Sequence, residues 1–337
     1  MVHAQYYEVA EEGKVRCHLC PHHCMIKNKK SGICNVRMNN EGKLYSGVYG
    51  KISAINFDPI EKKPLYHFFP GSNILSVGSI GCNLSCDFCQ NHEISQGCSP
   101  DNPFLKNYHI DEVINMALSH SDNLGIAYTY NEPTVWFEYM LDIAKKAKEN
   151  ILKNVMVTNG FINEDPLNEL LKYVDAFSVD LKSWSDKFYK KYTSSALEPV
   201  KRTIQKIYES GRFLEITNLV IPGLNDNKTE FEEMVQWISG ELDTSIVLHI
   251  SRYHPAYKMD IQPTSLSTLE NLYDIAKKHL HYVYIGNMIT SKGNNTYCPE
   301  CRSLLIKREG YLTSVAGLNN QGQCISCSFQ AIPAFAI

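Results

Sequence analysis

Residues 74–91 read ILSVGSIGCNLSCDFCQN, a short apolar run followed at once by three cysteines. The run ILSVGS (74–79) predicts a buried strand. Cys82, Cys86 and Cys89 then give the spacing C-x3-C-x2-C, with no fourth cysteine in register. Iron–sulfur cubanes take thiolate ligands, usually four, so three would leave one iron open, as catalysis requires. Structural zinc normally has four ligands, which makes zinc the weaker interpretation.

The chain around this stretch alternates between strand and helix patterns. The expected strands are 74–79, 123–130, 154–158, 175–182, 213–221, 245–250 and 282–286. The expected helices are 109–120, 134–149, 166–174, 196–211, 228–238 and 266–280. The strands are nearly continuously apolar, as in a parallel α/β sheet covered on both faces. A doubly wound sheet and a full or partial (βα) barrel both fit, and in either one functional residues follow the strands at their C-terminal ends.

Composition narrows the class of protein. The 337 residues are 44% hydrophobic and 20% charged, as in an ordinary globular protein, and the net charge of −3 gives no electrostatic reason to expect nucleic acid. No apolar run is long enough to cross a membrane, and the N-terminal residues lack the pattern of a signal peptide. We therefore expect a cytoplasmic chain without a membrane partner.

Twelve cysteines are unusual for a cytoplasmic chain, where disulfides seldom persist. Eleven of them fall into three tight groups, and only Cys98 stands apart, separated from Cys89 by eight residues. Cys98 could close the central site, but this spacing is long. Short fixed spacings in a reducing compartment indicate metal ligands.

The two outer groups each contain four cysteines. Cys17, Cys20, Cys24 and Cys34 can close around zinc or around an iron–sulfur cluster, and the spacing does not choose between them. The second group is Cys298, Cys301, Cys324 and Cys327. It forms two CxxC knuckles with 22 residues between them, which is typical of a zinc ribbon or of a rubredoxin-like iron site.

These groups divide the chain into three expected parts: a cysteine-rich N-terminal subdomain (1–72), an α/β domain (73–290) and a metal-binding tail (291–337). Within the first part, KLYSGVYGKISAINF (43–57) and LYHFF (65–69) look like short strands.

Polar motifs follow the expected strands in order. They are YTYNEPT (128–134), TNG (158–160), DLK (180–182), VIPGLND (220–226) and YHP (253–255). With the cysteine motif and Phe88 just before its last cysteine, this series resembles the radical S-adenosylmethionine superfamily. The resemblance implies a [4Fe-4S] cluster on Cys82, Cys86 and Cys89, and S-adenosylmethionine chelating its open iron.

The resemblance also implies which other side chains contact the cofactor. These are Phe88, Asn131, Glu132, Asn159, Asp180, Lys182 and His254. Glu132 stands where the superfamily usually has Gly-Gly-Glu-Pro, although Tyr130 and Asn131 replace the two glycines. A carboxylate at this position suits the ammonium group of the ligand. The DLK, VIPGLND and YHP segments are similar to those of glycyl-radical-enzyme activases.

The flanking segments refine the resemblance. RCHLCPHHC (16–24), GICNVR (32–37), DPIEKKPLYHFFPGS (58–72) and the CxxC pairs resemble the AmmeMemoRadiSam-system radical enzyme family, whose members are similar to pyruvate formate-lyase activating enzymes. The implied fold is a partial (βα)6 TIM-like barrel with small cysteine-rich appendages.

The implied chemistry is cleavage of S-adenosylmethionine to a 5′-deoxyadenosyl radical, with a reductant such as flavodoxin or ferredoxin. A glycyl-radical partner protein is the first expected target. A small molecule, a peptide or RNA is the alternative, with the outer groups as auxiliary zinc or iron sites. A non-catalytic metal-binding or electron-transfer protein is the third reading.

Overall fold

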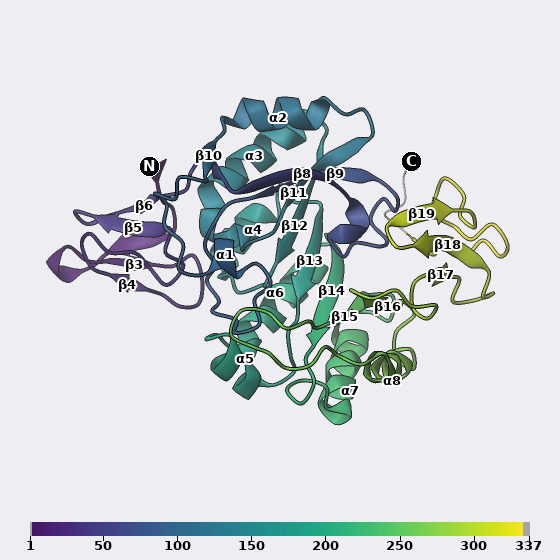
Figure 1. Ribbon diagram of the computed structural model, residues 1–337. Helices are drawn as coiled ribbons and strands as arrows, with labels where there is room; N and C mark the ends of the chain where they lie inside the picture. Colours follow the sequence, from purple (N-terminus) through teal and green to yellow (C-terminus); the bar gives the residue numbers. More distant parts are fainter. Residues whose placement is uncertain (1, 333–337) are drawn as a thin grey trace.

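The computed structural model describes residues 2–332, and its centre is an eight-stranded sheet (Figure 1). Seven of the strands are parallel and lie side by side in the order in which they occur in the chain. They are β9 (Asn73–Gly78), β11 (Asn123–Tyr128), β12 (Lys153–Thr158), β13 (Ala176–Asp180), β14 (Phe213–Val220), β15 (Val247–Arg252) and β16 (Val283–Gly286).

This strand order decides between the two expected α/β folds. A doubly wound sheet reverses its strand order at a switch point, whereas here every crossover advances in one direction. The fold is therefore a partial barrel, as expected, and all seven expected strands are present and parallel, one more than the (βα)6 description implies. An antiparallel strand, β8 (Ala54–Pro59), pairs with β9 and forms one edge, while β16 forms the other. No expected element anticipated that β8 would join this sheet.

The helices cover the outside of the curved sheet (Figure 1). They are α2 (Ile110–Leu118), α3 (Phe137–Glu149), α4 (Glu164–Leu170), α5 (Asp186–Tyr192), α6 (Leu197–Glu209), α7 (Lys228–Trp237) and α8 (Leu266–Ala276). In α6, Val200, Ile204 and Ile207 follow the helical repeat and are fully buried. Gly211, at φ +71°, stands just past the end of α6, as its position in the sequence predicts.

Short elements complete the described chain. They are η1 (Glu11–Gly13), β7 (Lys51–Ile52), η2 (Ile60–Lys62), α1 (His92–Ser95), β10 (Lys106–Asn107), η3 (Pro133–Trp136) and η4 (Ile238–Leu242). Between residues 2 and 332 there is no helix both long and apolar enough to cross a membrane.

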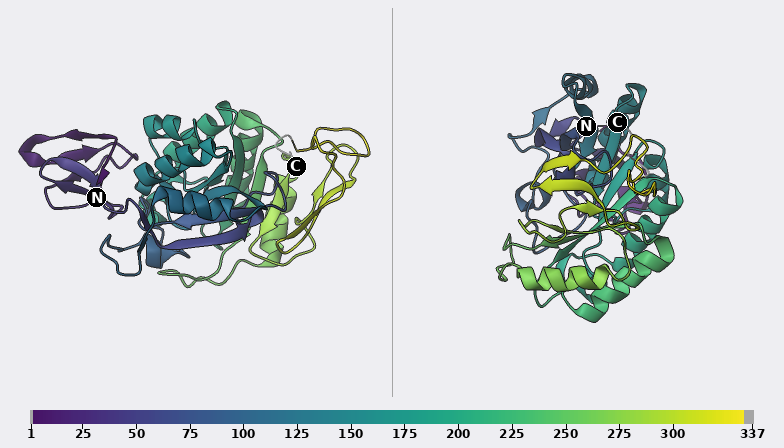
Figure 2. Two further views of the ribbon diagram at one scale, coloured as in Figure 1. Left: turned by 90° about the horizontal axis from the view of Figure 1, so that it is seen from above. Right: turned by 90° about the vertical axis from the view of Figure 1, so that its right-hand side faces the viewer.

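The N-terminal part forms two small antiparallel sheets, β1-β6-β5 and β2-β3-β4, at one end of the barrel (Figure 2). Their strands are β1 (Val2–His3), β2 (Tyr7–Val9), β3 (Val15–Cys17), β4 (Met25–Ile26), β5 (Arg37–Asn40) and β6 (Lys43–Ser46). A buried ion pair fixes them to α3: Arg37 Nη1 lies 2.9 Å and 3.0 Å from the two carboxylate oxygens of Glu138. Because both groups are out of water, losing one partner would strand the other charge.

The tail forms a three-stranded sheet of β17 (Thr296–Tyr297), β18 (Leu304–Glu309) and β19 (Leu312–Val315) at the other end of the barrel (Figure 2). Arg308 attaches it: its guanidinium donates to the carbonyl of Tyr66 at 2.7 Å and lies 4.4 Å from the centre of the Tyr66 ring. Thr313 adds a bond from its hydroxyl to Glu61 at 2.7 Å.

The segment LYHFF (65–69) closes the N-terminal end of the barrel. Leu65 and Phe68 are buried in an apolar cluster. The cluster also contains Ile60, Ile74, Ala127, Val155 and Ala176, with Phe213 packed against it.

The expectation of a short strand at LYHFF is therefore wrong. Backbone N–H groups of Tyr66 and His67 donate to the carboxylate of Glu215 at 3.0 Å and 2.7 Å, not to a neighbouring strand. The apolar pattern is real, but it reflects packing into the barrel.

Residues 65–69, which plug the N-terminal end of the barrel, give a direct test of stability. Phe68 is 4% exposed, so Phe68→Ala leaves a cavity that the surrounding side chains cannot fully fill. We therefore expect the free energy of unfolding to fall by about 3–5 kcal/mol. Phe104, which is 86% exposed, provides the matched control Phe104→Ala. Chemical denaturation measures both, and equal midpoints for the two variants would contradict the plug.

Candidate active site and metal sites

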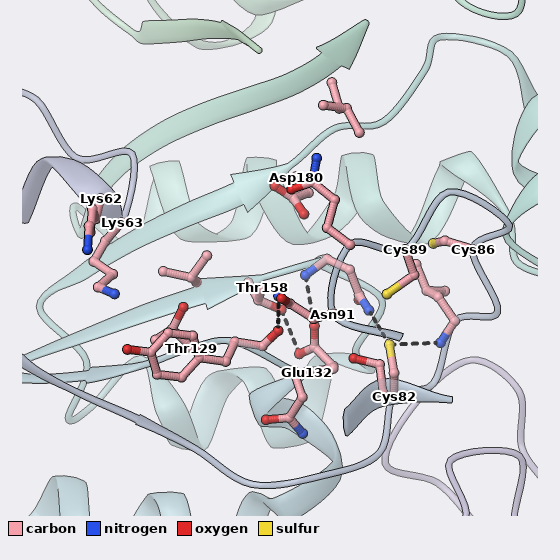
Figure 3. A pocket seen from close by; sticks show the side chains of 18 of the residues that line it. Lys62, Lys63, Cys82, Cys86, Cys89, Asn91, Thr129, Glu132, Thr158 and Asp180 are labelled. Carbon is pink, nitrogen blue, oxygen red and sulfur yellow. Dashed lines mark hydrogen bonds between the residues drawn. The ribbon is translucent and has the colours of Figure 1, made fainter. Parts of the chain in front are cut away.

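A pocket of about 770 Å³ opens at the C-terminal ends of the first strands of the barrel. The loop between β9 and α1 brings Cys82, Cys86 and Cys89 to its wall (Figure 3). The ends of β11, β12 and β13 supply Glu132, Asn159, Asp180 and Lys182. The rule that functional residues follow parallel strands therefore holds for these positions.

The cysteine loop is fixed by its main chain. The N–H groups of Ser85 and Asp87 donate to carbonyls at the C-terminal end of α5, those of Thr193 at 2.9 Å and Tyr192 at 3.0 Å. Two N–H donors approach the sulfur of Cys82, the backbone of Leu84 at 3.4 Å and the side chain of Asn159 at 3.7 Å. Phe88 is buried against Phe188, with ring centres 5.8 Å apart.

The sulfurs of Cys82, Cys86 and Cys89 fit a cluster better than a single ion. Across the described residues 2–332, these three do not form a set whose ligand atoms all lie within 4.8 Å of one another. Burial raises the pKa of the Cys86 thiol to about 12 and also raises the pKa of Cys82. Coordination to a metal deprotonates such thiols outright, so the donor set suits an iron–sulfur cluster.

Glu132 lies beside these cysteines and is 3% exposed. Its Oε1 accepts from the backbone of Thr134 at 3.0 Å and the hydroxyl of Thr158 at 2.8 Å. Its Oε2 accepts from the backbone of Asn159 at 2.8 Å. Burial raises the pKa of this carboxyl, and its three neutral donors only partly offset that rise. Within the described chain the Glu132 carboxylate forms no salt bridge. Its charge could therefore be balanced by the cationic group of a bound ligand.

Two further predicted residues reach the pocket as an ion pair. Lys182 Nζ lies 2.9 Å from Asp180 Oδ2. Burial lowers the pKa of Lys182, but the adjacent Asp180 more than offsets this and raises it overall. This lysine therefore stays charged on the pocket wall.

Asn131 and His254 lie differently from the way the motifs suggested. The Asn131 side chain lines the pocket, but its amide accepts from Ser79 N–H at 3.0 Å and donates to the Gly81 carbonyl at 2.8 Å. It thus ties β11 to the cysteine loop. His254 is exposed and is not among the residues that line the pocket, while the neighbouring Tyr253 turns inward and donates to the carbonyl of Met259 at 2.9 Å.

The opposite end of the pocket carries charges that the motifs did not identify. Asp58 on β8 lies 2.8 Å from Lys63 Nζ and 3.0 Å from Lys62 Nζ, and the hydroxyl of Tyr130 donates to it at 2.8 Å. Burial raises the pKa of Asp58, but these partners outweigh it and hold the pKa well below the ordinary range. Residues 58–63 were quoted only for a family resemblance, and the available signal was the charge pattern D-x3-KK.

The tail cysteines form a compact metal-ligand set. The four sulfurs of Cys298, Cys301, Cys324 and Cys327 all lie within 4.8 Å of one another. Two of their separations are 3.6 Å, between Cys298 and Cys327 and between Cys301 and Cys324. Zinc–sulfur bonds of about 2.3 Å imply tetrahedron edges of about 3.8 Å, so this set suits one tetrahedral ion.

The central part of the chain matches a known protein superfamily. Residues 77–238 match the model of the Radical SAM superfamily. The chain is 42% identical over 321 residues to an uncharacterised protein of Methanocaldococcus jannaschii, with 95% of both chains covered.

Other matches are more distant. The 4-hydroxyphenylacetate decarboxylase activating enzyme of Clostridium scatologenes is 21% identical, over 63% of this chain and 72% of its own. A radical SAM methyltransferase structure from Sphaerobacter thermophilus superposes with a TM-score of 0.50 at 15% identity, covering 65% of this chain and 67% of its own, which shows a shared fold.

The tail set makes a prediction about metal content. We expect Cys301→Ser to lose one metal ion per chain, because removing one of four sulfur ligands lowers the affinity of the site for its metal ion. Cys98 stands outside all three groups and donates to the Ile94 carbonyl at 3.1 Å, so Cys98→Ser is the control and should keep every ion. Metal analysis of the purified proteins decides, and an unchanged content in Cys301→Ser would refute the site.

Proposed function

The chain belongs to the radical SAM superfamily, and we propose that Cys82, Cys86 and Cys89 bind the [4Fe-4S] cluster that its members use with S-adenosylmethionine. What carries this proposal is the position of three cysteine sulfurs in one pocket with the buried carboxylate of Glu132. Three thiolates leave one iron open for the amino acid end of the cofactor. When bound, the cluster and S-adenosylmethionine supply a 5′-deoxyadenosyl radical that abstracts hydrogen.

The residues of the chain orient the cofactor and exclude water. Glu132 would accept the ammonium group, because a buried carboxylate bound only by neutral donors gains most from a cation. The backbone N–H of Asn159 donates to the Glu132 carboxylate and its side chain donates toward Cys82, which links the carboxylate to the cysteine loop. The Asp180–Lys182 pair presents both charges to the remaining polar groups of the ligand.

We propose a protein substrate as the first target, with hydrogen abstracted from the backbone of a glycyl-radical partner enzyme. Similarity to activating enzymes supports this proposal. A low-potential one-electron donor, such as a flavodoxin or ferredoxin, would reduce the cluster. The finer resemblance to the AmmeMemoRadiSam-system family stays a prediction, as do the cytoplasmic location and the three-part domain division.

A small anionic molecule is the second candidate target. Lys62 and Lys63 oppose the single carboxylate of Asp58 at one end of the same pocket, which leaves an excess of positive charge at that end. Electron paramagnetic resonance of the reduced enzyme with S-adenosylmethionine and candidate partner proteins separates the two targets. A glycyl radical on a partner supports the first, and its absence with every candidate favours the second.

Loss of a central cysteine tests the catalytic reading. We expect Cys86→Ala to abolish release of 5′-deoxyadenosine, because two thiolates cannot hold the cluster. Cys98→Ala should release as much as the wild type. Chromatography of anaerobic reactions with a chemical reductant measures both. If the wild type releases none, the protein is the non-catalytic metal or electron-transfer protein of the third reading.

Glu132 should affect cofactor binding but not the cluster. We expect Glu132→Gln to weaken S-adenosylmethionine binding by about tenfold, because a charge-assisted contact becomes a neutral one. Iron content should stay the same. Equilibrium dialysis measures the affinity, and Glu149→Gln on the exposed end of α3 is the control. An unchanged affinity in Glu132→Gln would remove this residue from the cofactor site.

A further inference from the structure

A second group of cysteines lies directly behind the active-site pocket. Its four members line one small cavity in the N-terminal part: Cys17, Cys20, Cys24 and Cys34. Cys17 and Cys34 are buried, while Cys20 and Cys24 are partly exposed toward the outside. The accessible wall of this cavity is apolar, so it offers no polar group to orient an organic substrate.

Backbone N–H groups surround this cavity. Backbone N–H groups donate to three of the sulfurs: that of His22 to Cys20, that of Ile33 to Cys24, and those of Val36 and Arg37 to Cys34. Asn35 adopts φ +64°, so the N–H groups that follow it turn back toward Cys34. Such concave arrangements of N–H groups are anion sites found at many iron–sulfur centres.

Arg37 supplies an independent sign of a missing anionic group. It is 1% exposed and lines the cavity. Its two terminal nitrogens bond to Glu138 and to the carbonyl of Gln5, but its Nε has no partner. A buried guanidinium nitrogen without an acceptor is costly, and a thiolate-ligated cluster would provide one.

The spacing of the sulfurs distinguishes this group from the tail group. Across the described residues 2–332, only the tail cysteines bring three or more ligand atoms within 4.8 Å of one another. No three of the four N-terminal sulfurs do so, and neither do Cys82, Cys86 and Cys89. A single zinc ion needs edges of about 3.8 Å, so the N-terminal sulfurs, like those of the central site, are spread more widely than a one-ion site requires.

The two cysteine groups touch through their main chains. A Cβ atom on Gly81 would lie 2.6 Å from the carbonyl oxygen of Cys34, so the backbone just before Cys82 rests on the backbone of the second group. The ring of His22 donates to the carbonyl of Asn83 at 2.7 Å. Asn83 lines the four-cysteine cavity, while its neighbour Cys82 lines the active-site pocket.

We propose that Cys17, Cys20, Cys24 and Cys34 hold a second iron–sulfur cubane, and that it passes one electron to the cluster at Cys82, Cys86 and Cys89. Four thiolates leave no open iron, which suits electron transfer and not substrate binding. A low-potential iron–sulfur or flavin protein loses one electron at the exposed side of Cys20 and Cys24. The second cubane gains this electron and gives it up to the central cluster, with no proton transferred. The relay rests on the proposed function, whereas the presence of the cubane does not.

The triple variant Cys82→Ala/Cys86→Ala/Cys89→Ala tests the presence of the cubane. Purified without oxygen as the full chain, it should retain one cubane's iron and acid-labile sulfide. Zinc without sulfide, or no metal beyond the tail ion, would overturn the proposal. If this variant does not fold, the wild type decides: on reduction it should show two cluster signals in electron paramagnetic resonance, only one of which shifts with S-adenosylmethionine. A single signal that shifts completely would overturn it.

The variant Cys24→Ala tests the relay, with Cys98→Ala as the control. With a reduced ferredoxin as the donor, Cys24→Ala should form 5′-deoxyadenosine at least an order of magnitude more slowly than the control. With titanium(III) citrate, which reaches the central cluster directly, the two rates should be similar. An equal loss with both reductants, or none with either, would overturn the relay. No product from the wild type with either reductant would instead refute the proposed function, and the sulfide count of the triple variant would still test the cubane.

Discussion

The carboxylate of Glu132 is buried next to three cysteine sulfurs and is bonded only by neutral donors. Placing it there joins the segment after β11 to the end of β12, because its donors are Thr134 in η3, Thr158 at the end of β12 and Asn159 just beyond it. Asn131 fixes the cysteine loop to the same turn of chain. The cofactor site thus depends on one buried charge whose missing partner is a cation, which matches the ammonium group of S-adenosylmethionine.

A buried arginine anchors each of the two appendages to the barrel. The N-terminal sheets attach to α3 through the buried Arg37–Glu138 pair, and the tail attaches to the plug of the barrel through Arg308 on Tyr66. Each appendage carries four cysteines, but with different spacing: a compact set suited to one ion in the tail, and a wider set against the central site. The difference in spacing is the basis for proposing different roles, a structural metal in the tail and an electron carrier beside the central site.

Much of this arrangement could be predicted from the sequence, because the strongest signals are local. Continuous apolar runs such as 74–79 and 213–221 predicted the parallel strands, and the strand-end rule predicted positions for Glu132, Asp180 and Lys182 that prove to line one pocket. Long-range contacts produced the failures. LYHFF is apolar because it plugs the barrel, and β8 could not be assigned to the sheet before its partner was known. The positions of Asp58, Lys62 and Lys63 in the pocket depend on that same pairing, so the sequence alone could not place them.

The central claim is that the open iron of a cluster at Cys82, Cys86 and Cys89 chelates S-adenosylmethionine through its amino and carboxylate groups. Electron–nuclear double resonance on the reduced protein, with nitrogen-15 in the methionine amino group, tests this claim directly. We expect a resolved hyperfine coupling between this nitrogen and the cluster. Binding of the labelled cofactor without any such coupling would contradict the account.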